Sequence, residues 1–178
     1  MDNRKLLGIE MGRISAAEYH ELEPRGLVVV LDNVRSAHNV GSAFRSCDAF
    51  RADELILCGI CATPPSPEIH KTALGAEDSV PSRYFSNTLD AVRSLKSQGY
   101  TVLAVEQTVS SVALDAFIPQ PDKKYALVMG NEVEGVGQDV VDECDGALEI
   151  PQWGTKHSLN VSVALGIILW HFRPGDSK

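Results

Sequence analysis

The sequence predicts an α/β fold with a mostly parallel sheet that carries helices on both faces. Residues 26–31 (GLVVVL), 101–105 (TVLAV) and 125–129 (YALVM) are short, continuous apolar segments. Such segments are typical of strands that are buried on both faces of a parallel sheet. Segments with helical spacing separate them, as at 38–50 and 89–98, and regular alternation of strands and helices indicates the α/β class.

Each element is predicted from its apolar spacing and from the residues that bound it. Gly99 is a typical helix stop, 63–67 (TPPSP) indicates a rigid loop, and 120–122 (QPD) indicates a turn. Strands are predicted, in chain order, at 26–31, 55–58, 83–85, 101–105, 125–129 and 147–150. Helices are predicted at 38–50, 69–76, 89–98, 138–144 and 158–172. Pro174 and Gly175 are expected to end the last helix.

The chain is expected to form one domain preceded by an arm. A length of 178 residues is enough to bury a sizeable core. The sequence contains no internal repeat, low-complexity segment or linker. Residues 1–25 are mixed and polar, with helical spacing around 14–22 and a proline at position 24. We therefore expect an N-terminal arm over 1–25 and a single domain over 26–178.

The charge distribution places a basic loop on an acidic body. The net charge is −8, and residues 131–149 contain seven acidic residues but no lysine or arginine. Residues 33–51 contain three arginines and one aspartate. Because phosphate contacts dominate nucleic-acid affinity, this composition does not favour tight binding of a large bare RNA surface. The local field around 33–51 nevertheless suits an anionic ligand.

Two further features bear on location and metal binding. No segment approaches the ~20 consecutive apolar residues of a membrane-spanning helix, and residues 1–13 contain no apolar run of signal-peptide length. We therefore expect a cytoplasmic protein without membrane contact. Cys58 and Cys61 form a lone C-x-x-C, without a second pair or a suitably spaced histidine. We expect no metal site and interpret the cysteines as reduced, structural thiols.

Three polar loops, each after a short apolar strand, are the most informative part of the sequence. They are 33–45 (NVRSAHNVGSAFR), 130–137 (GNEVEGVG) and 150–160 (IPQWGTKHSLN). The third leads into the long apolar helix, and a helix start presents unpaired N–H groups and a positive dipole end to a polar ligand. Glycine at 130 permits close backbone approach to a ligand, although an ordinary strand-to-helix turn explains it equally well. Neither G-x-G-x-x-G nor a P-loop lysine is present.

In order and spacing, these motifs resemble those of the SpoU/TrmH family of RNA ribose 2'-O-methyltransferases, within the SPOUT superfamily. The first motif corresponds to 39–45 (NVGSAFR), the second to Gly130-Asn131-Glu132 with Gly135, and the third to 158–164 (SLNVSVA). The similarity covers roughly residues 27–172. It implies a SPOUT-like fold with a C-terminal trefoil knot, in which the segment after Gly130 threads through a loop and builds the cofactor pocket.

The resemblance also implies an activity. The family transfers a methyl group from S-adenosyl-L-methionine (AdoMet) to a ribose 2'-hydroxyl of tRNA or rRNA. It acts as a homodimer with the active site near the subunit interface, for which the first and last helices are candidates. A catalytically silent RNA-binding or assembly module of the same fold is an alternative, which the presence of all the motif residues disfavours. A nucleotide-binding oxidoreductase is disfavoured by the missing glycine fingerprint.

The resemblance assigns residues to roles in the site. The predicted catalytic residues are Asn39, Arg45, Glu132, Ser158 and Asn160. The predicted cofactor-binding residues are Met129, Gly130, Asn131, Gly135, Ile150, Ser158 and Leu159. Arg35 and Lys156 are candidates for contacts with RNA phosphates, and solvated charges are the alternative for both.

Physical chemistry narrows some of these roles. A guanidinium stays protonated in proteins, so we expect Arg45 to grip a phosphate and offset alkoxide charge instead of acting as a base. Glu132 is expected either to orient Arg45 by a salt bridge or to take the proton itself. Ser158 is equally a helix N-cap. Asn160, as the third residue of the predicted helix, indicates a specific hydrogen bond because asparagine is a poor helix-interior residue. Gly41 indicates either close packing or ligand approach.

Overall fold

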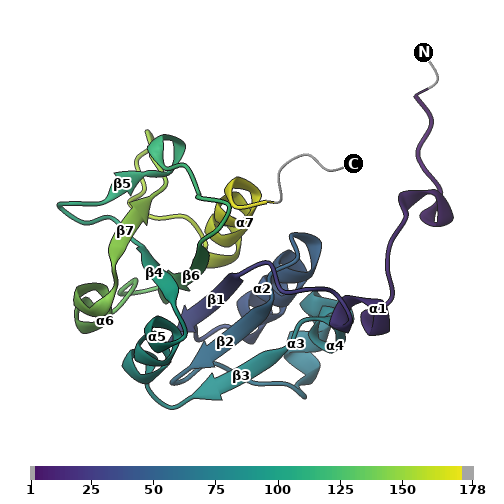
Figure 1. Ribbon diagram of the computed structural model, residues 1–178, viewed down its shortest axis with the longest axis horizontal. Helices are drawn as coiled ribbons and strands as arrows, with labels where there is room; N and C mark the ends of the chain where they lie inside the picture. The colour runs from purple at the N-terminus through teal and green to yellow at the C-terminus, as the bar shows by residue number, and fades with distance from the viewer. Residues whose placement is uncertain (1–2, 174–178) are drawn as a thin grey trace.

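A seven-stranded parallel sheet organises the protein, whose computed structural model describes residues 3–173 (Figure 1). Its strands are β1 (Leu27–Asp32), β2 (Glu54–Cys58), β3 (Ser82–Phe85), β4 (Tyr100–Val105), β5 (Val112–Ala113), β6 (Lys124–Met129) and β7 (Gly146–Glu149). They lie in the order β3-β2-β1-β6-β4-β7-β5, and all neighbouring pairs are parallel. The six predicted strands are confirmed to within one residue at each end. The two-residue β5 was not predicted, because so short a segment has no periodicity.

Helices connect the strands. They are α1 (Ala16–His20), α2 (Ala37–Ala49), α3 (Pro67–Ala73), α4 (Ala76–Ser79), α5 (Thr88–Ser97), α6 (Gln138–Glu143) and α7 (Val161–His171), with 3-10 turns η1 (Gly8–Met11) and η2 (Leu114–Ala116). The helix predicted at 69–76 is α3, displaced towards the N-terminus. The side chain of Ser66 caps its first turn, and Leu74 ends it by adopting a left-handed conformation. Within residues 3–173, no helix is long and apolar enough to cross a membrane.

The last helix begins at Val161, so the prediction that it begins at Ser158 is wrong. Asn160 is its N-cap, and the Asn160 side chain accepts a hydrogen bond from the backbone N–H of Ser162 at 2.9 Å. Asparagine is favourable at an N-cap, so the argument from a poor helix-interior residue does not apply. Ser158 lies in the preceding loop. The helix stop predicted at Pro174 and Gly175 lies outside the described residues.

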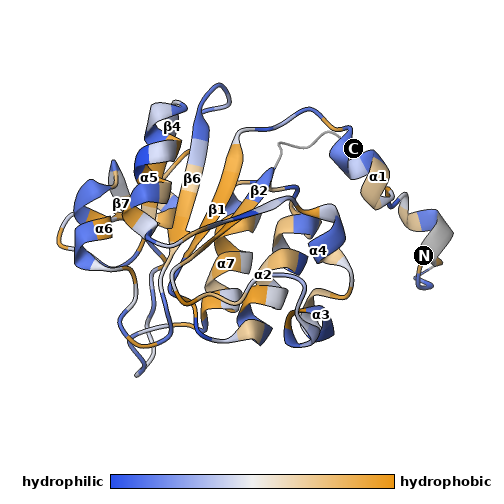
Figure 2. Cartoon of the chain, turned by 90° about the horizontal axis from the view of Figure 1, so that it is seen from below, coloured by the Kyte–Doolittle hydropathy of each residue, from blue (hydrophilic) through white to orange (hydrophobic). Residues whose placement is uncertain are grey.

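Two apolar layers confirm the prediction of helices on both faces of the sheet. Alternate residues of a strand point to opposite faces, so Val29 and Leu31 of β1 pack with α2, α3, α4 and α7. Val28 and Val30 pack on the other face with α5 and α6. Figure 2 shows β1 as a ribbon that is hydrophobic over most of its length and lies between these layers. Because a strand buried on both faces has no solvent-exposed side, nearly all of its residues are apolar, and the sequence shows a continuous apolar run.

The N-terminal segment is joined to the body through α1. Tyr19 is buried, and its hydroxyl donates to the carbonyl of Ala52 at 2.7 Å. Residues 3–7 and 10–14 are exposed, and Figure 1 shows this part of the chain leading away from the sheet. The chain enters β1 where the Asp53 carboxylate accepts three backbone N–H groups, from residues 25, 26 and 27.

A buried carboxylate, Asp32, ties three segments together at the carboxyl end of β1. Asp32 is 3% exposed. It accepts hydrogen bonds from the Thr88 hydroxyl at 2.6 Å, the Asn33 side-chain amide at 2.9 Å and the Gly137 backbone N–H at 2.9 Å. Because Gly137 ends the second motif loop and Thr88 begins α5, this network holds the second motif against the body.

Replacement of Asp32 by alanine is expected to lower the free energy of unfolding by about 2–4 kcal/mol, because three donors then lose a buried acceptor. Urea unfolding followed by circular dichroism measures the change. The matched control is Asp122→Ala at an exposed turn, which is expected to change stability by less than about 0.5 kcal/mol. Equal stabilities of the two variants would contradict the proposed contribution of the network.

Candidate functional site

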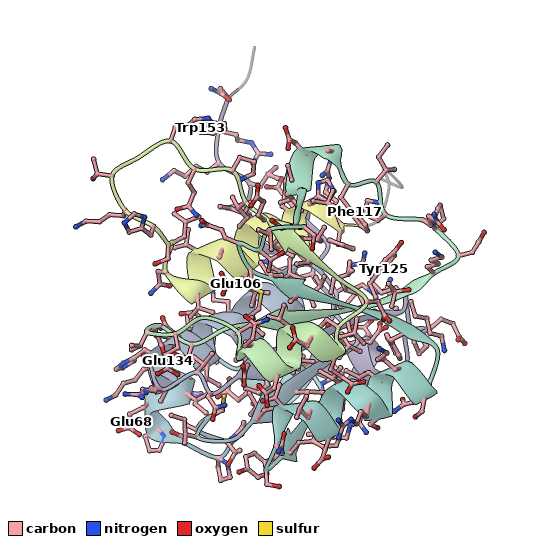
Figure 3. All side chains as sticks on the ribbon, turned by 90° about the vertical axis from the view of Figure 1, so that its left-hand side faces the viewer. Glu68, Glu106, Phe117, Tyr125, Glu134 and Trp153 are labelled. Carbon is pink, nitrogen blue, oxygen red and sulfur yellow. The ribbon has the colours of Figure 1, made fainter. Side chains whose placement is uncertain are left out.

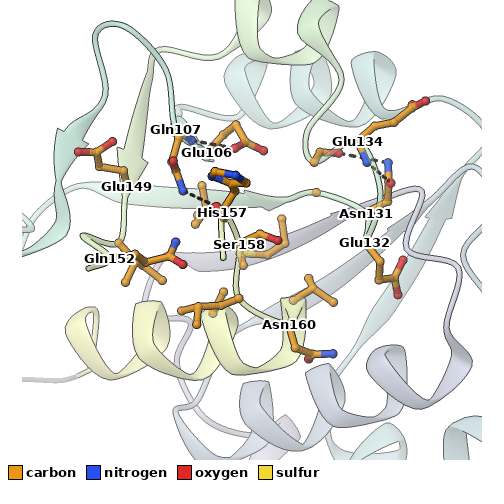
Figure 4. A pocket seen from close by; sticks show the side chains of 18 of the residues that line it. Glu106, Gln107, Asn131, Glu132, Glu134, Glu149, Gln152, His157, Ser158 and Asn160 are labelled. Carbon is orange, nitrogen blue, oxygen red and sulfur yellow. Dashed lines mark hydrogen bonds between the residues drawn. The ribbon is translucent and has the colours of Figure 1, made fainter. Parts of the chain in front are cut away.

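A pocket of about 460 Å³ lies at the carboxyl ends of three neighbouring strands, β6, β4 and β7. Register pairs Val105 of β4 with Met129 of β6 and with Leu148 of β7, so these three ends form its floor. Ligands of open α/β sheets bind outside the carboxyl ends of the strands. We call this cavity the motif pocket, because the second and third motif loops form its walls (Figure 4).

Most of the predicted site residues meet at the motif pocket. All the predicted cofactor-binding residues line it: Met129, Gly130, Asn131, Gly135, Ile150, Ser158 and Leu159. Three predicted catalytic residues also line it, namely Glu132, Ser158 and Asn160. Asn39 adjoins the pocket through hydrogen bonds to two of these. Arg45 is the predicted catalytic residue that lies elsewhere.

The second motif loop is a tight turn that closes on itself. The backbones of Asn131 and Gly135 exchange two hydrogen bonds, at 3.0 and 3.2 Å. The side-chain oxygen of Asn131 accepts the N–H groups of Val133 and Glu134, both at 2.9 Å. A Cβ at Gly130 would lie 2.1 Å from the carbonyl carbon of Gly135. The backbone of the loop therefore leaves no space for a side chain at position 130, whether or not a ligand is bound. The side chain of Asn131 stabilises the loop through its two hydrogen bonds.

One residue from each motif joins a hydrogen-bonded chain at the mouth of the pocket. The side-chain amide of Asn160 donates to the side-chain oxygen of Asn39 at 3.3 Å. The Asn39 amide in turn donates to the Glu132 carboxylate at 2.7 Å. The same carboxylate accepts the backbone N–H groups of Arg35 and Ser36, at the N-terminus of α2. Tertiary structure thus brings together residues that are 93 and 121 positions apart in the sequence.

These contacts define the charge state of Glu132. Burial raises the pKa of its carboxyl group, but hydrogen bonds from Asn39, Arg35 and Ser36 outweigh burial and bring the pKa below its usual 4.5. A general base works best when its pKa lies near the working pH. A carboxylate with a lowered pKa is a weak base, so the geometry favours Glu132 as the residue that orients Asn39.

Arg45 lies outside the motif pocket of its own chain. It is exposed on α2, beside a separate hollow of about 450 Å³ that Ser42, Lys71 and Thr72 also line. Arg45 follows Asn39 by six positions on the helix, which is about 9 Å along the axis and about a third of a turn around it. Within residues 3–173, Glu132 pairs with Asn39 and the start of α2 and makes no salt bridge with Arg45. The first alternative for Glu132, a salt bridge that orients Arg45, is therefore not present.

Gly41 is explained by close packing. A Cβ at this position would lie 2.2 Å from the Thr72 hydroxyl and 2.3 Å from the Ile69 carbonyl oxygen. Glycine therefore lets α2 and α3 approach closely. The same contact places Lys71 of α3 beside Arg45, which makes the hollow basic.

The two candidate RNA contacts lie on the rim and are exposed. Arg35 binds Glu132 through its backbone N–H, which leaves its side chain outside this network. Lys156 lies in the third motif loop. In the same loop, Gln152 lines the pocket, whereas Trp153 is 93% exposed. Figure 3 shows Trp153 at the outer end of the loop, far from Glu106.

Sequence reasoning missed three polar residues of the pocket wall: Glu106, Gln107 and Glu149. Glu106 and Gln107 directly follow the predicted strand 101–105, and this position at a carboxyl strand end was the available signal. The Gln107 side-chain amide donates to the His157 carbonyl at 2.8 Å and so links the loop after β4 to the third motif loop. The two residues are 50 positions apart, so no local sequence pattern indicates that they interact.

The wall of the motif pocket is acidic. Four carboxylates line it, from Glu106, Glu132, Glu134 and Glu149, and its lining residues include no lysine or arginine. A cleft lined by one sign of charge concentrates ligands of the opposite sign. The motif pocket therefore suits a ligand that carries positive charge, while the hollow beside Arg45 and Lys71 suits an anion.

Comparison with known proteins finds RNA methyltransferases that are similar to this chain along most of its length. The enzyme named 23S rRNA (guanosine-2'-O-)-methyltransferase RlmB of Xanthomonas axonopodis pv. citri is 32% identical over 82% of this chain and 57% of its own length. A putative TrmH family tRNA/rRNA methyltransferase of Staphylococcus aureus is 31% identical over 84% of this chain and 59% of its own length. The chain thus spans little more than half the length of these curated relatives.

Solved structures agree. The AdoMet-bound rRNA methyltransferase from Sinorhizobium meliloti superposes with a TM-score of 0.76 at 31% identity, over 86% of this chain and 58% of that one. The TrmH/SpoU tRNA modifying enzyme of A. aeolicus superposes with a TM-score of 0.75 at 29% identity, over 88% and 79%. Residues 26–170 match the SpoU rRNA Methylase family. The chain therefore belongs to the SpoU rRNA methylase family, as its three motifs indicate.

Proposed function

We propose that this protein transfers the methyl group of AdoMet to a ribose 2'-hydroxyl of tRNA or rRNA. The observation that carries the proposal is the hydrogen-bonded chain Asn160–Asn39–Glu132, because it joins one residue of each family motif at the mouth of one pocket. Family membership supports the reaction. The AdoMet-bound relative supports the cofactor, and the rRNA and tRNA enzymes among the relatives support the substrate class.

The motif pocket fits AdoMet in size and charge. Its volume of about 460 Å³ falls in the range of about 300–1,000 Å³ that is usual for cofactor sites. The apolar side chains of Leu148, Ile150 and Leu159 provide a surface for the adenine, and the acidic wall complements a sulfonium and an ammonium group. When bound, AdoMet supplies an electrophilic methyl group.

The residues of the chain supply orientation and charge. The amides of Asn39 and Asn160 are held at the mouth, where they orient the ribose, and Ser158 lies beside them on the pocket wall. Positioning of this kind accounts for a large part of the rate of a bimolecular reaction. We assign Arg45 to the substrate phosphate, with Lys71 beside it in the same hollow. Arg35 and Lys156, on the rim of the motif pocket, are assigned to further phosphates of the RNA.

We infer that the active form is a homodimer that uses α7. Val163, Ile167 and Trp170 are 52%, 38% and 57% exposed, and they share one side of the helix. Aligned large apolar side chains on a surface mark an interaction site. Because Arg45 lies outside the pocket of its own chain, a second copy near α2 and α7 is the arrangement that places this guanidinium at an active site.

Three further features belong to the proposal. Residues 26–178 form one methyltransferase domain and residues 1–25 an arm, which the family match over 26–170 supports. The segment after Gly130 forms the trefoil knot, which is supported by the insertion of β6 between β1 and β4 and of β7 between β4 and β5. We also propose a cytoplasmic location, which the rRNA- and tRNA-modifying relatives support.

The direct test is incubation with radiolabelled AdoMet and unmodified total tRNA or rRNA, followed by nuclease digestion and identification of the labelled nucleoside. Label in a 2'-O-methyl nucleoside is the expected result. Cofactor binding without transfer to any RNA would contradict the proposal and favour a silent RNA-binding module.

Replacement of Glu132 by glutamine is expected to lower the rate of methyl transfer about tenfold to a hundredfold, at a nearly unchanged AdoMet affinity, because Asn39 loses its charged acceptor. Single-turnover transfer and calorimetric titration separate the two effects. Glu21→Gln, a change at an exposed carboxylate outside the motif pocket, is the matched control and should retain activity. Equal losses in both variants would argue against a specific role for Glu132.

A further inference from the structure

Glu106 occupies a central position in the motif pocket. It follows β4, the middle strand of the three that form the floor. One oxygen of its carboxylate accepts the backbone N–H of Gln107 at 2.8 Å, and the other accepts the backbone N–H of Val136 at 3.1 Å. Figure 4 shows Glu106 between the Gln107 and His157 side of the pocket and the Asn131 side.

The neighbouring loop keeps the Glu106 carboxylate in this place. Gly135 has a φ of 72°, a conformation that favours glycine. A Cβ there would lie 2.1 Å from a carboxylate oxygen of Glu106. The carboxylate therefore fills the space of the side chain that residue 135 lacks. Two hydrogen bonds to two different loops hold it there, so its negative charge is fixed with respect to a ligand in the pocket.

The other three carboxylates of the wall are placed differently. Glu132 is bound to Asn39 and to the N-terminus of α2, at the mouth. Glu149 accepts the Ser111 hydroxyl at 2.9 Å on the opposite side, and Glu134 is exposed at the outer edge. Since no lysine or arginine is among the lining residues, the charge of Glu106 meets no opposing side-chain charge in the pocket.

We propose that Glu106 is a specificity-determining residue that favours the positively charged methyl donor over the neutral thioether left after transfer. This inference rests on the proposed function. In that reaction the bond between sulfur and the methyl carbon breaks, and sulfur keeps the electron pair. The methyl group forms a bond to the 2'-oxygen, and the hydroxyl proton passes to solvent. The ligand thereby loses one positive charge, so the attraction by Glu106 ends when the product forms, and the product leaves more readily.

The test compares dissociation constants by isothermal titration calorimetry at low ionic strength. The ligands are AdoMet, its neutral product S-adenosylhomocysteine, and sinefungin, whose amine carries a positive charge in place of the sulfonium. Glu106→Gln is expected to weaken AdoMet and sinefungin about tenfold more than S-adenosylhomocysteine. Added salt should shrink this difference, because it screens charge.

Two further variants separate charge from loop support. Glutamine keeps the shape of Glu106 but loses one hydrogen bond, and that loss weakens all three ligands alike. Glu106→Asp keeps the charge and is expected to preserve the ratio of AdoMet to S-adenosylhomocysteine affinity. Glu149→Gln, at the opposite side of the pocket, should change the ratio by less than about threefold, because its charge is more distant.

The outcomes are distinct. The role of Glu106 would be overturned if Glu106→Gln left the ratio of AdoMet to S-adenosylhomocysteine affinity unchanged. It would also be overturned if Glu149→Gln or Glu106→Asp changed this ratio as much as Glu106→Gln does. Either result would count against Glu106 even if wild-type protein binds AdoMet and methylates RNA. If wild-type protein binds neither AdoMet nor S-adenosylhomocysteine, the proposed function fails and this inference fails with it. A ratio that falls only in Glu106→Gln supports the inference.

Discussion

Replacement of Arg45 by lysine is expected to lower methyl transfer at least about a hundredfold, while AdoMet affinity stays within about threefold of wild type. Lysine keeps the positive charge but loses the planar fork that binds a phosphate through two parallel hydrogen bonds. Cofactor affinity is spared because Arg45 lies outside the motif pocket of its own chain, beside Ser42, Lys71 and Thr72.

The measurement pairs single-turnover transfer of radiolabelled methyl groups with calorimetric titration of AdoMet. Arg93→Lys is the matched control, because Arg93 is exposed on α5, on the other face of the sheet, where it pairs with Glu143. That variant is expected to retain full activity. Full activity of Arg45→Lys would remove Arg45 from the catalytic residues, and a large loss of AdoMet affinity would place it at the cofactor instead.

Gly130→Ala is expected to weaken AdoMet binding more than tenfold and to destabilise the protein by about 1–3 kcal/mol, because the added methyl group overpacks the loop. The new Cβ would lie 2.1 Å from the carbonyl carbon of Gly135 and 2.2 Å from the backbone nitrogen of Val136. Both neighbours are backbone atoms, which cannot turn away as a flexible side chain does. The turn that forms one wall of the pocket must therefore open.

Thermal unfolding and calorimetric titration measure the two effects of this substitution. Gly154→Ala is the control, since a Cβ at this exposed position of the third loop meets nothing within 4 Å. It is expected to leave both stability and affinity close to those of wild type. If Gly130→Ala bound AdoMet as tightly as wild type, the closed turn would not be needed for the pocket.

The strands and helices of the fold were predictable because their signals are local. β1, β4 and β6 are buried on both faces, and each is therefore an unbroken apolar run in the sequence. The start of α7 was misplaced by three residues because Ser158 and Asn160 are both favourable cap residues. The structure uses Asn160, whose side chain accepts the N–H of Ser162 and donates to Asn39 of α2.

The site was predictable as three loops but not as a geometry. Spacing and residue type identified 39–45, the segment after Gly130, and 158–164, and resemblance assigned their residues to roles. Neither signal showed that Asn39 mediates between Glu132 and Asn160. Neither singled out Glu106 or Gln107, because one polar residue after a strand does not differ from many others until its neighbours in space are known.

The sequence by itself determined the α/β class, the order of the elements and the family motifs, since each depends on residues that are close together along the chain. Only the tertiary structure decided that Arg45 stands outside the pocket, that Glu132 binds the start of α2, and that Glu106 fills the space beside Gly135. The physical reason is that parallel strands bring together chain segments that lie far apart in sequence. The contacts made at their ends depend on strand order and register, which no local pattern encodes.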